Sequence, residues 1–330
     1  MNLTVRFAAR RLSRALGIRG TTLSSVFLFG AGASYGSGPC HPHAPPLGRE
    51  LFAALQENGG VAATVGSELS AVFARDFEEG MDRFWAERNT ETTRLLREMA
   101  AYFARFEPKP GNYYSELLQL LRGTRKRATF VTTNYDLLIE LAASNAGLQI
   151  TYGGFPVPNN NIPLLKIHGS CNFLPALQPR QITGIGFDMS NSSGGSIIET
   201  GVVAARSTME VLEFCQREDS VAPAIAMYSP DKRVLFCRGF VQAQQEAWQR
   251  ALKEASRVFT LGLRVHPVDK HIWGPLASAS APLFYVGREP DTFLEWAASE
   301  QRRNTFVLAR TFQEAIPQIA GHLGLRQRTH

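Results

Sequence analysis

The sequence lacks the features that mark membrane, zinc-ribbon and disulfide-stabilised proteins. No stretch reaches the roughly 18 to 20 apolar residues that span a bilayer, so no membrane-spanning helix is predicted. No C-x-x-C pair is present, which gives no support to a zinc ribbon or a disulfide framework. Low cysteine use without an export signal favours a reducing, cytoplasmic location. The cysteines are Cys40, Cys171, Cys215 and Cys237.

Acidic residues are absent from the first 20 residues, which carry five arginines. The chain has a formal charge of +6, so only +1 remains for everything after residue 20. A nucleic-acid-binding role would rest on this segment and on a C-terminal tail with Arg326 and Arg328. Because the body of the chain is nearly neutral, direct binding to nucleic acid is not expected. The five arginines are Arg6, Arg10, Arg11, Arg14 and Arg19.

The same N-terminal segment has apolar residues at roughly helical spacing. Leu3, Phe7 and Leu12 alternate with the arginines, which predicts a basic N-terminal helix over residues 1–22 that lies on a surface or at an interface. An organelle transit peptide is the alternative, because such peptides are Arg-rich, amphipathic and poor in acidic residues.

The rest of the chain alternates between strand-like and helix-like patterns. Short apolar runs rich in β-branched and aromatic residues are typical of buried parallel strands. Helical patterns at 135–145 and 240–255 lie between some of them. This alternation predicts an α/β fold with a doubly wound, Rossmann-like, mostly parallel sheet covered on both faces. The runs are 24–30, 127–134, 163–169, 256–262, 282–287 and 304–309.

Two segments interrupt the alternation. Amphipathic patterns over about 50–122 predict a helical insertion, and a mixed segment over about 175–230 contains the flexible run N-S-S-G-G-S near residue 191. No internal repeat is present. The predicted organisation is therefore a basic N-terminal helix followed by one Rossmann-like domain over 23–330 that carries both insertions.

The first predicted strand ends in the glycine turn G-A-G-A-S, residues 30–34. Gly30 and Gly32 would let the backbone approach a pyrophosphate, and a following helix would offer N–H groups to its charge. A purely structural glycine turn is an equally common alternative. The turn departs from the dehydrogenase fingerprint, because Tyr35 occupies the third glycine position and no acidic strand end follows about 20 residues later. Ordinary hydride transfer is therefore not favoured.

Polar residues follow two further predicted strands. Thr133, Asn134 and Asp136 end the strand at 127–132, and His168 ends the next one. Ligands bind at the carboxyl ends of strands in open α/β sheets. Each residue also has a structural alternative, because Asn and Asp often cap helices and a lone His is usually satisfied within the fold.

Taken as an ordered set, the motifs G-A-G-A-S, T-T-N-Y-D and K-I-H-G-S resemble the sirtuin-like superfamily. More specifically, the chain resembles the divergent bacterial branch, whose members are commonly NAD-consuming effectors of anti-phage defence. Asn134 follows Gly30 by 104 residues and precedes His168 by 34. The segment L-G-L-R-V-H-P-V-D-K-H-I-W, residues 261–273, is similar to a fourth motif of that branch. The resemblance extends over residues 26 to about 290.

The resemblance implies a role for each matching residue. Asn134 would lie beside the nicotinamide ribose and position its hydroxyls or an attacking water, with Thr133 and Asp136 in the same pocket. His168 would be the general base. The diphosphate turn would comprise Gly30, Ala31, Gly32, Ala33 and Ser34, and the adenosine half would be lined by Gly262, Leu263, Val286 and Gly287.

One departure from the family bears on the reaction. Protein-deacylating sirtuins carry a zinc module with paired C-x-x-C ligands, and this chain has none. Water is then the favoured acceptor, and the resemblance implies an NAD glycohydrolase that yields nicotinamide and ADP-ribose. A His of near-neutral pKa contributes typically about 10² to 10⁴-fold as a base in such a step. The alternatives are an NAD-dependent protein deacylase or ADP-ribosyltransferase, and a non-catalytic sensor that binds NAD or ADP-ribose.

The implied partners follow from the same resemblance. NAD is the substrate, no metal is expected, and His41 and His43 in a proline-rich loop are weak candidates for metal ligands. That loop matches the mobile segment that folds over NAD in the family. An unrestrained NAD hydrolase would be toxic to its own cell. We therefore expect a resting state controlled by a separately encoded sensor or regulatory protein, or by homo-oligomerisation.

Overall fold

The computed structural model describes residues 24–122, 127–153, 161–176, 199–217, 221–226, 234–266 and 269–325. Three sequence predictions fall outside these ranges: the N-terminal helix over 1–22, the Gly/Ser run near residue 191, and the tail with Arg326 and Arg328.

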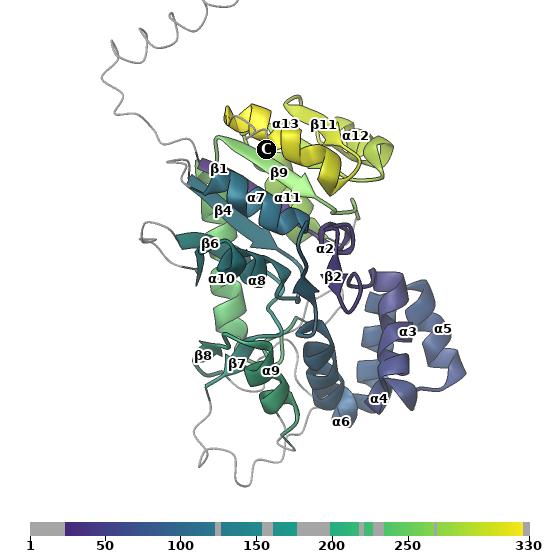
Figure 1. The fold of residues 1–330 in the computed structure, drawn as a ribbon. Coiled ribbons are helices and arrows are strands. Elements are labelled where there is room, and N and C mark those ends of the chain that lie inside the picture. Colours follow the sequence, from purple (N-terminus) through teal and green to yellow (C-terminus); the bar gives the residue numbers. More distant parts are fainter. Residues whose placement is uncertain are drawn as a thin grey trace, which may run out of the picture.

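A seven-stranded sheet forms the centre of the molecule, and every neighbouring pair of its strands is parallel (Figure 1). The doubly wound α/β fold is thus confirmed. Six of the strands coincide with predicted runs, and β5 was not predicted. In spatial order the strands are β11 (Thr305–Ala309), β10 (Leu283–Val286), β9 (Arg257–Leu261), β1 (Ser24–Phe29), β4 (Arg127–Thr132), β6 (Asn161–Lys166) and β5 (Gln149–Tyr152).

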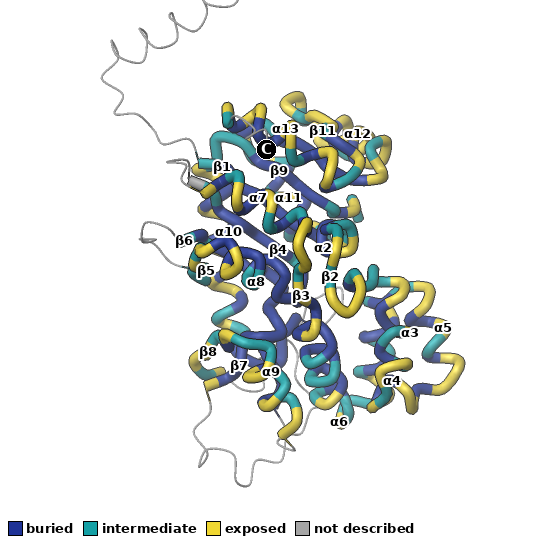
Figure 2. The backbone as a smooth tube through the Cα atoms, viewed as in Figure 1, coloured by how far each residue is buried: buried dark blue, intermediate teal, exposed yellow. Residues whose placement is uncertain are grey.

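Helices cover both faces of the sheet because successive strand residues point to opposite sides. In β1, Val26 and Leu28 join one apolar cluster, whereas Phe27 and Phe29 join another. The inner strands are consequently buried throughout most of their length, the edge strands β11 and β5 are only partly buried, and the outer helix faces are exposed (Figure 2). The first cluster contains α10 (Arg238–Glu254), α11 (Lys270–Ser278) and α12 (Pro290–Ser299), and the second contains α7 (Tyr113–Leu121), α8 (Leu138–Asn145) and α13 (Phe312–Leu323).

Phenylalanines at matching register form a row of stacked rings across four strands. Phe27 stacks on Phe259 with ring centroids 4.9 Å apart, Phe259 on Phe284 at 5.1 Å, and Phe284 on Phe306 at 5.4 Å. Each adjacent pair is also a register pair of neighbouring strands. Aromatic pairs of this kind contribute about 0.5–1.5 kcal/mol beyond their buried area. The row therefore helps to fix the register of β1, β9, β10 and β11.

A group of four helices stands beside the sheet (Figure 1). Phe52 and Phe73 stack at 3.7 Å between ring centroids, and the side chain of Asp76 caps the longest helix by accepting from two backbone N–H groups. Among the residues that the structure describes, no helix combines the length and apolarity needed to cross a membrane. The four helices are α3 (Gly48–Asn58), α4 (Gly60–Ala63), α5 (Ser67–Arg75) and α6 (Phe77–Phe103).

Smaller elements complete the described part of the chain. The short helix α2 (Ala31–Tyr35) follows β1 directly, and α9 (Thr208–Cys215) packs against α6. Two short antiparallel pairs lie outside the main sheet: β2 (Cys40–His41) with β3 (Glu107–Pro108), and β7 (Phe173–Pro175) with β8 (Val202–Ala204).

The strand order reverses at β1. The next three strands of the sheet in sequence, β4, β5 and β6, lie on one side of β1, and the last three, β9, β10 and β11, lie on the other. A crevice forms beyond the carboxyl ends of strands at such a switch point. Here the turn after β1 contacts the turn after β9 directly. The Gly30 backbone N–H donates to the Leu261 carbonyl at 2.9 Å, and the Gly32 N–H donates to the Gly262 carbonyl at 3.0 Å.

Gly262 has no room for a side chain at this contact. A Cβ atom there would lie 2.0 Å from the Ala33 nitrogen, and its φ of +63° favours glycine. We predict that Gly262→Ala lowers the free energy of unfolding by about 2–5 kcal/mol, from overpacking and backbone strain together. Urea denaturation measures this. The control is Gly321→Ala in α13, where a Cβ meets no atom within 4 Å beyond its chain neighbours and its own helix, and a gain of up to about 1 kcal/mol is expected. Equal effects of the two substitutions would contradict the prediction.

Candidate functional site

A cavity of about 780 Å³ lies at the carboxyl ends of β1, β9 and β10. It is lined from the glycine turn of β1, the turn after β9, the end of β10 and the end of β6. Nine of the thirteen predicted site residues line it. These nine are Ala31, Gly32, Ala33, Thr133, His168, Gly262, Leu263, Val286 and Gly287.

The remaining four predicted residues, Gly30, Ser34, Asn134 and Asp136, are not in the cavity lining. The Asn134 Nδ2 donates to the Gly30 carbonyl at 2.9 Å and to Ser34 Oγ at 2.8 Å. Ser34 Oγ also lies 3.1 Å from the hydroxyl of buried Tyr114. The amide of Asn134 therefore joins the end of β4 to the glycine turn, although 104 residues separate the two in sequence.

Asp136 is buried at the start of α8. Its Oδ1 accepts a hydrogen bond from the Leu138 backbone N–H at 3.1 Å, and the fully buried Lys166 donates to the Asp136 carbonyl at 2.6 Å. Lys166 also pairs with Glu140 at 2.8 Å. Burial raises the pKa of the Asp136 carboxyl, and the nearby Lys166 ammonium opposes that shift. Asp136 therefore lies in the core and does not line the cavity.

His168 is 5% exposed and lies directly after β6, where it lines the cavity. Its Nε2 lies 2.6 Å from Nε2 of His271, and the ring centroids are 4.9 Å apart. His271 is in the first turn of α11. His271 belongs to the segment 261–273, but its sequence position predicts no role for it, because only the fold brings His271 and His168 together.

The backbone of the glycine turn is largely satisfied within the fold. The Gly32 N–H donates to Gly262 and the Ala33 N–H donates to the Gly30 carbonyl at 2.9 Å. An anionic ligand would therefore need other donors. Five arginines line the cavity, together with as many acidic residues. The arginines are Arg49, Arg75, Arg264, Arg288 and Arg310.

These arginines differ in their present contacts. Arg264 pairs with Glu289 at 3.3 Å, and the Arg288 guanidinium lies 5.9 Å from the centroid of the Tyr35 ring. No local sequence pattern identifies these arginines, since they are scattered singly along the chain.

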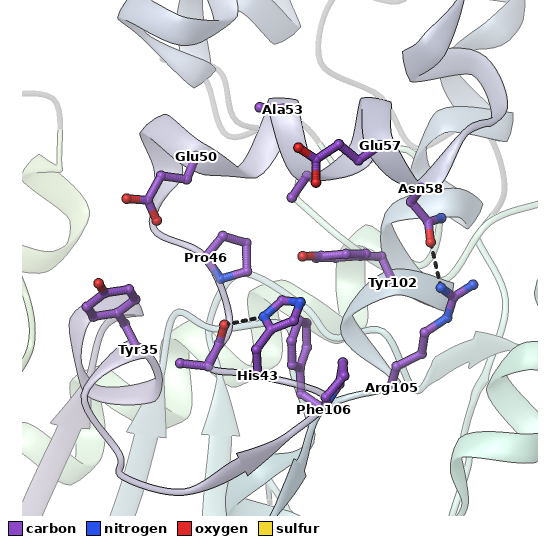
Figure 3. Close-up of a pocket in the computed structure, with 13 residues that line it drawn as sticks. Tyr35, His43, Pro46, Glu50, Ala53, Glu57, Asn58, Tyr102, Arg105 and Phe106 are labelled. Atoms are coloured by element: carbon purple, nitrogen blue, oxygen red, sulfur yellow. Dashed lines mark hydrogen bonds between the residues drawn. The ribbon is translucent and has the colours of Figure 1, made fainter.

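A smaller cavity of about 520 Å³ adjoins the first and shares Tyr35 and Glu50 with it (Figure 3). Its lining includes His43, Tyr102 and Phe106, and the Asn58 side chain accepts from Arg105 at one end. The proline-rich loop contributes residues to both cavities.

The beginning of this proline-rich loop is held in place by side-chain and backbone contacts. Asn112 donates from Nδ2 to Ser37 Oγ at 3.0 Å, and β2 pairs with β3.

Cys171, Cys215 and Cys237 do not line the cavity and are poor nucleophiles. Burial raises the pKa of Cys215 to about 12 and that of Cys237 to about 11, and it raises the pKa of Cys171 as well. In the ranges that the structure describes, no three or more His, Cys, Asp and Glu side chains are grouped so as to hold a metal ion.

A family model described as a SIR2-like domain matches residues 128–185, the segment that contains Asn134 and His168. Similar solved structures include a Sir2 homolog in complex with NAD, at 14% identity with a TM-score of 0.43, which covers 96% of this chain and 93% of that chain. Another, from work on sirtuin substrate affinity, has 15% identity and a TM-score of 0.44, and covers 96% of this chain and 99% of that chain. A search of curated proteins gave no significant match. The family-model match supports a relationship to the sirtuin-like superfamily.

Burial of Asp136 predicts a pH dependence of stability. Because its pKa is raised, the folded chain holds the Asp136 proton more tightly than the unfolded chain, so stability falls as pH rises above about 4. Asp136→Asn cannot ionise, and we expect a smaller fall. Urea denaturation between pH 4 and 7 compares the two slopes. Asp291→Asn on exposed α12 is the control and should keep the wild-type slope. An Asp136→Asn slope equal to that of the wild type would disprove the prediction.

Proposed function

We propose that the chain is an NAD glycohydrolase that cleaves the nicotinamide–ribose bond of NAD to release nicotinamide and ADP-ribose. One observation carries the proposal. Three motifs that lie far apart in sequence, those of Gly30, Asn134 and His168, meet around one cavity at the switch point of the sheet. The SIR2-like match over two of these motifs adds support.

NAD binding is proposed along the cavity. The adenosine half lies against Gly262, Leu263, Val286 and Gly287, and the nicotinamide ribose lies near Thr133 and His168. The diphosphate carries two negative charges. Since the turn N–H groups of Gly32 and Ala33 are already bonded, the arginines at the cavity, Arg288 and Arg310 among them, are proposed to neutralise these charges.

The chemistry requires a base and a dry ribose pocket. Departure of neutral nicotinamide leaves an oxocarbenium-like ribose, which a correctly placed water attacks. His168 is proposed to take the proton of that water. Asn134 is proposed to act beside the ribose and to hold the glycine turn, since its Nδ2 bonds to Gly30 and Ser34. Water is the preferred acceptor because the sequence has no C-x-x-C zinc module.

The biological role is proposed from the family resemblance. The chain would be the effector of a bacterial anti-phage, abortive-infection system in the cytoplasm. It would stay inactive until a separately encoded sensor or regulatory partner, or homo-oligomer assembly, triggers it.

A second function is favoured by one observation. The Asn134 side chain donates its hydrogen bonds to Gly30 and Ser34 and is not in the cavity lining. This arrangement is compatible with a sensor that binds NAD or ADP-ribose without cleaving it. The experiment below separates the two functions.

We predict that the wild-type protein, triggered in cells or assembled with its partner, converts NAD to nicotinamide and ADP-ribose. His168→Ala should lose at least about 100-fold in rate while still binding NAD, because it removes only the base. Asn134→Ala should lose activity too. Chromatography of the products measures turnover, and calorimetry measures binding. His322→Gln, on α13 and outside the cavity lining, is the matched control. NAD binding without turnover by the wild type under all these conditions would establish the sensor function instead.

A further inference from the structure

The two closest ring nitrogens in the site belong to His168 and His271. Their Nε2 atoms lie 2.6 Å apart, with ring centroids separated by 4.9 Å and planes inclined by 37°. At this distance two facing lone pairs would repel, so one nitrogen carries a hydrogen and donates it to the other. The contact is a hydrogen bond in which one imidazole donates and the other accepts.

The two histidines occupy different positions relative to the cavity. His168 lines it and is almost completely buried, whereas His271 is half-buried on α11 and is not in the lining. The base is thus contacted by a second imidazole from another element, in the way that a third group orients the base of a catalytic triad.

We propose that His271 is the positioning residue for His168, an inference that rests on the proposed NAD hydrolysis. For His168 to act as a base while its Nε2 faces His271, Nδ1 must hold the lone pair and Nε2 must carry the hydrogen. His271 then accepts that hydrogen bond, which fixes the tautomer and the ring orientation of His168.

The proton balance of the step follows from this arrangement. As the bond from ribose C1′ to nicotinamide breaks, its electron pair leaves with neutral nicotinamide. The water oxygen forms the new bond to C1′ and its proton passes to His168 Nδ1. The Nε2 proton of His168 shifts toward His271 Nε2, so the positive charge is shared by the pair until solvent removes one proton.

Other charged groups lie on the elements that carry the pair and on those packed against them. His266 and Asp269 line the cavity from the segment before α11, and Lys270 begins that helix. On the sheet side, Asp136 is buried and Lys166 is paired with Glu140.

From α10, the neutral Gln245 side chain donates to the Ile167 carbonyl at 2.9 Å. We call His168 and His271 together the dyad. Two positively charged rings would repel each other at 2.6 Å, so the dyad takes up its extra protons one at a time, and the two histidines titrate as a coupled pair.

The kinetic test compares wild type, His271→Ala, His271→Gln and the control His322→Gln in the triggered, full-length protein. We expect kcat to fall about 10- to 100-fold in His271→Ala, as for loss of an orienting partner, with little change in KM for NAD. His271→Gln can accept the hydrogen bond but cannot take the proton. It should recover part of kcat, and the acid limb of its pH profile should shift relative to wild type. An unchanged kcat and acid limb in both variants would overturn the proposal.

Nitrogen NMR of ¹⁵N-histidine-labelled protein without substrate tests the dyad separately from turnover. The expected result is that His168 is an Nε2–H tautomer whose titration moves in His271→Gln. This result in a protein that does not consume NAD would reject the proposed hydrolase and keep the dyad. Identical His168 tautomer and titration in wild type and His271→Gln would reject the dyad, whatever the activity.

Discussion

The backbone contact between the turn after β1 and the turn after β9 is the constraint on which the site depends. Gly30 and Gly32 approach Gly262 so closely that a Cβ atom on any of the three would lie less than 3 Å from a neighbouring atom. The contact fixes the separation of two strand ends at the point where the strand order reverses. The floor of the cavity, which we define as the part formed by Gly32 and Gly262, is therefore made of backbone, and the shape of this part does not depend on side-chain rotamers.

Polar side chains behind this floor tie it to the rest of the sheet. Asn134 bonds the turn to the end of β4, and Lys166 bonds the end of β6 to the start of α8. Buried polar groups of this kind stabilise only when all their hydrogen bonds are made, because an unpaired buried amide or ammonium is costly. They favour one arrangement of the three strand ends over nearby alternatives. A substitution in this network would consequently affect stability and ligand binding together, so neither effect can be interpreted without measuring the other.

The sequence predicted the sheet well because buried parallel strands have a strong apolar signal. The one strand of the seven-stranded sheet that was not predicted is β5. It has the sequence Q-I-T-Y and lies at the edge of the sheet, where burial is partial and polar residues are tolerated. In the site, strand-end motifs identified Thr133 and His168 as cavity residues. His271 and the cavity arginines could not be found in this way, because they come from segments without a shared local pattern and only tertiary structure brings them to one place.

The division of hydrogen bonds in the glycine turn bears on how an anion would be recognised. In dinucleotide-binding folds the turn itself offers N–H groups to the pyrophosphate. Here Gly32 and Ala33 donate to carbonyls of the protein, so in the proposed site the recognition of negative charge would pass to side chains such as Arg288 and Arg310. Side chains on different elements can be moved by a partner or by assembly, whereas a backbone turn cannot. A site that binds its anion in this manner is open to control from outside the cavity, as the proposed triggered hydrolase would require.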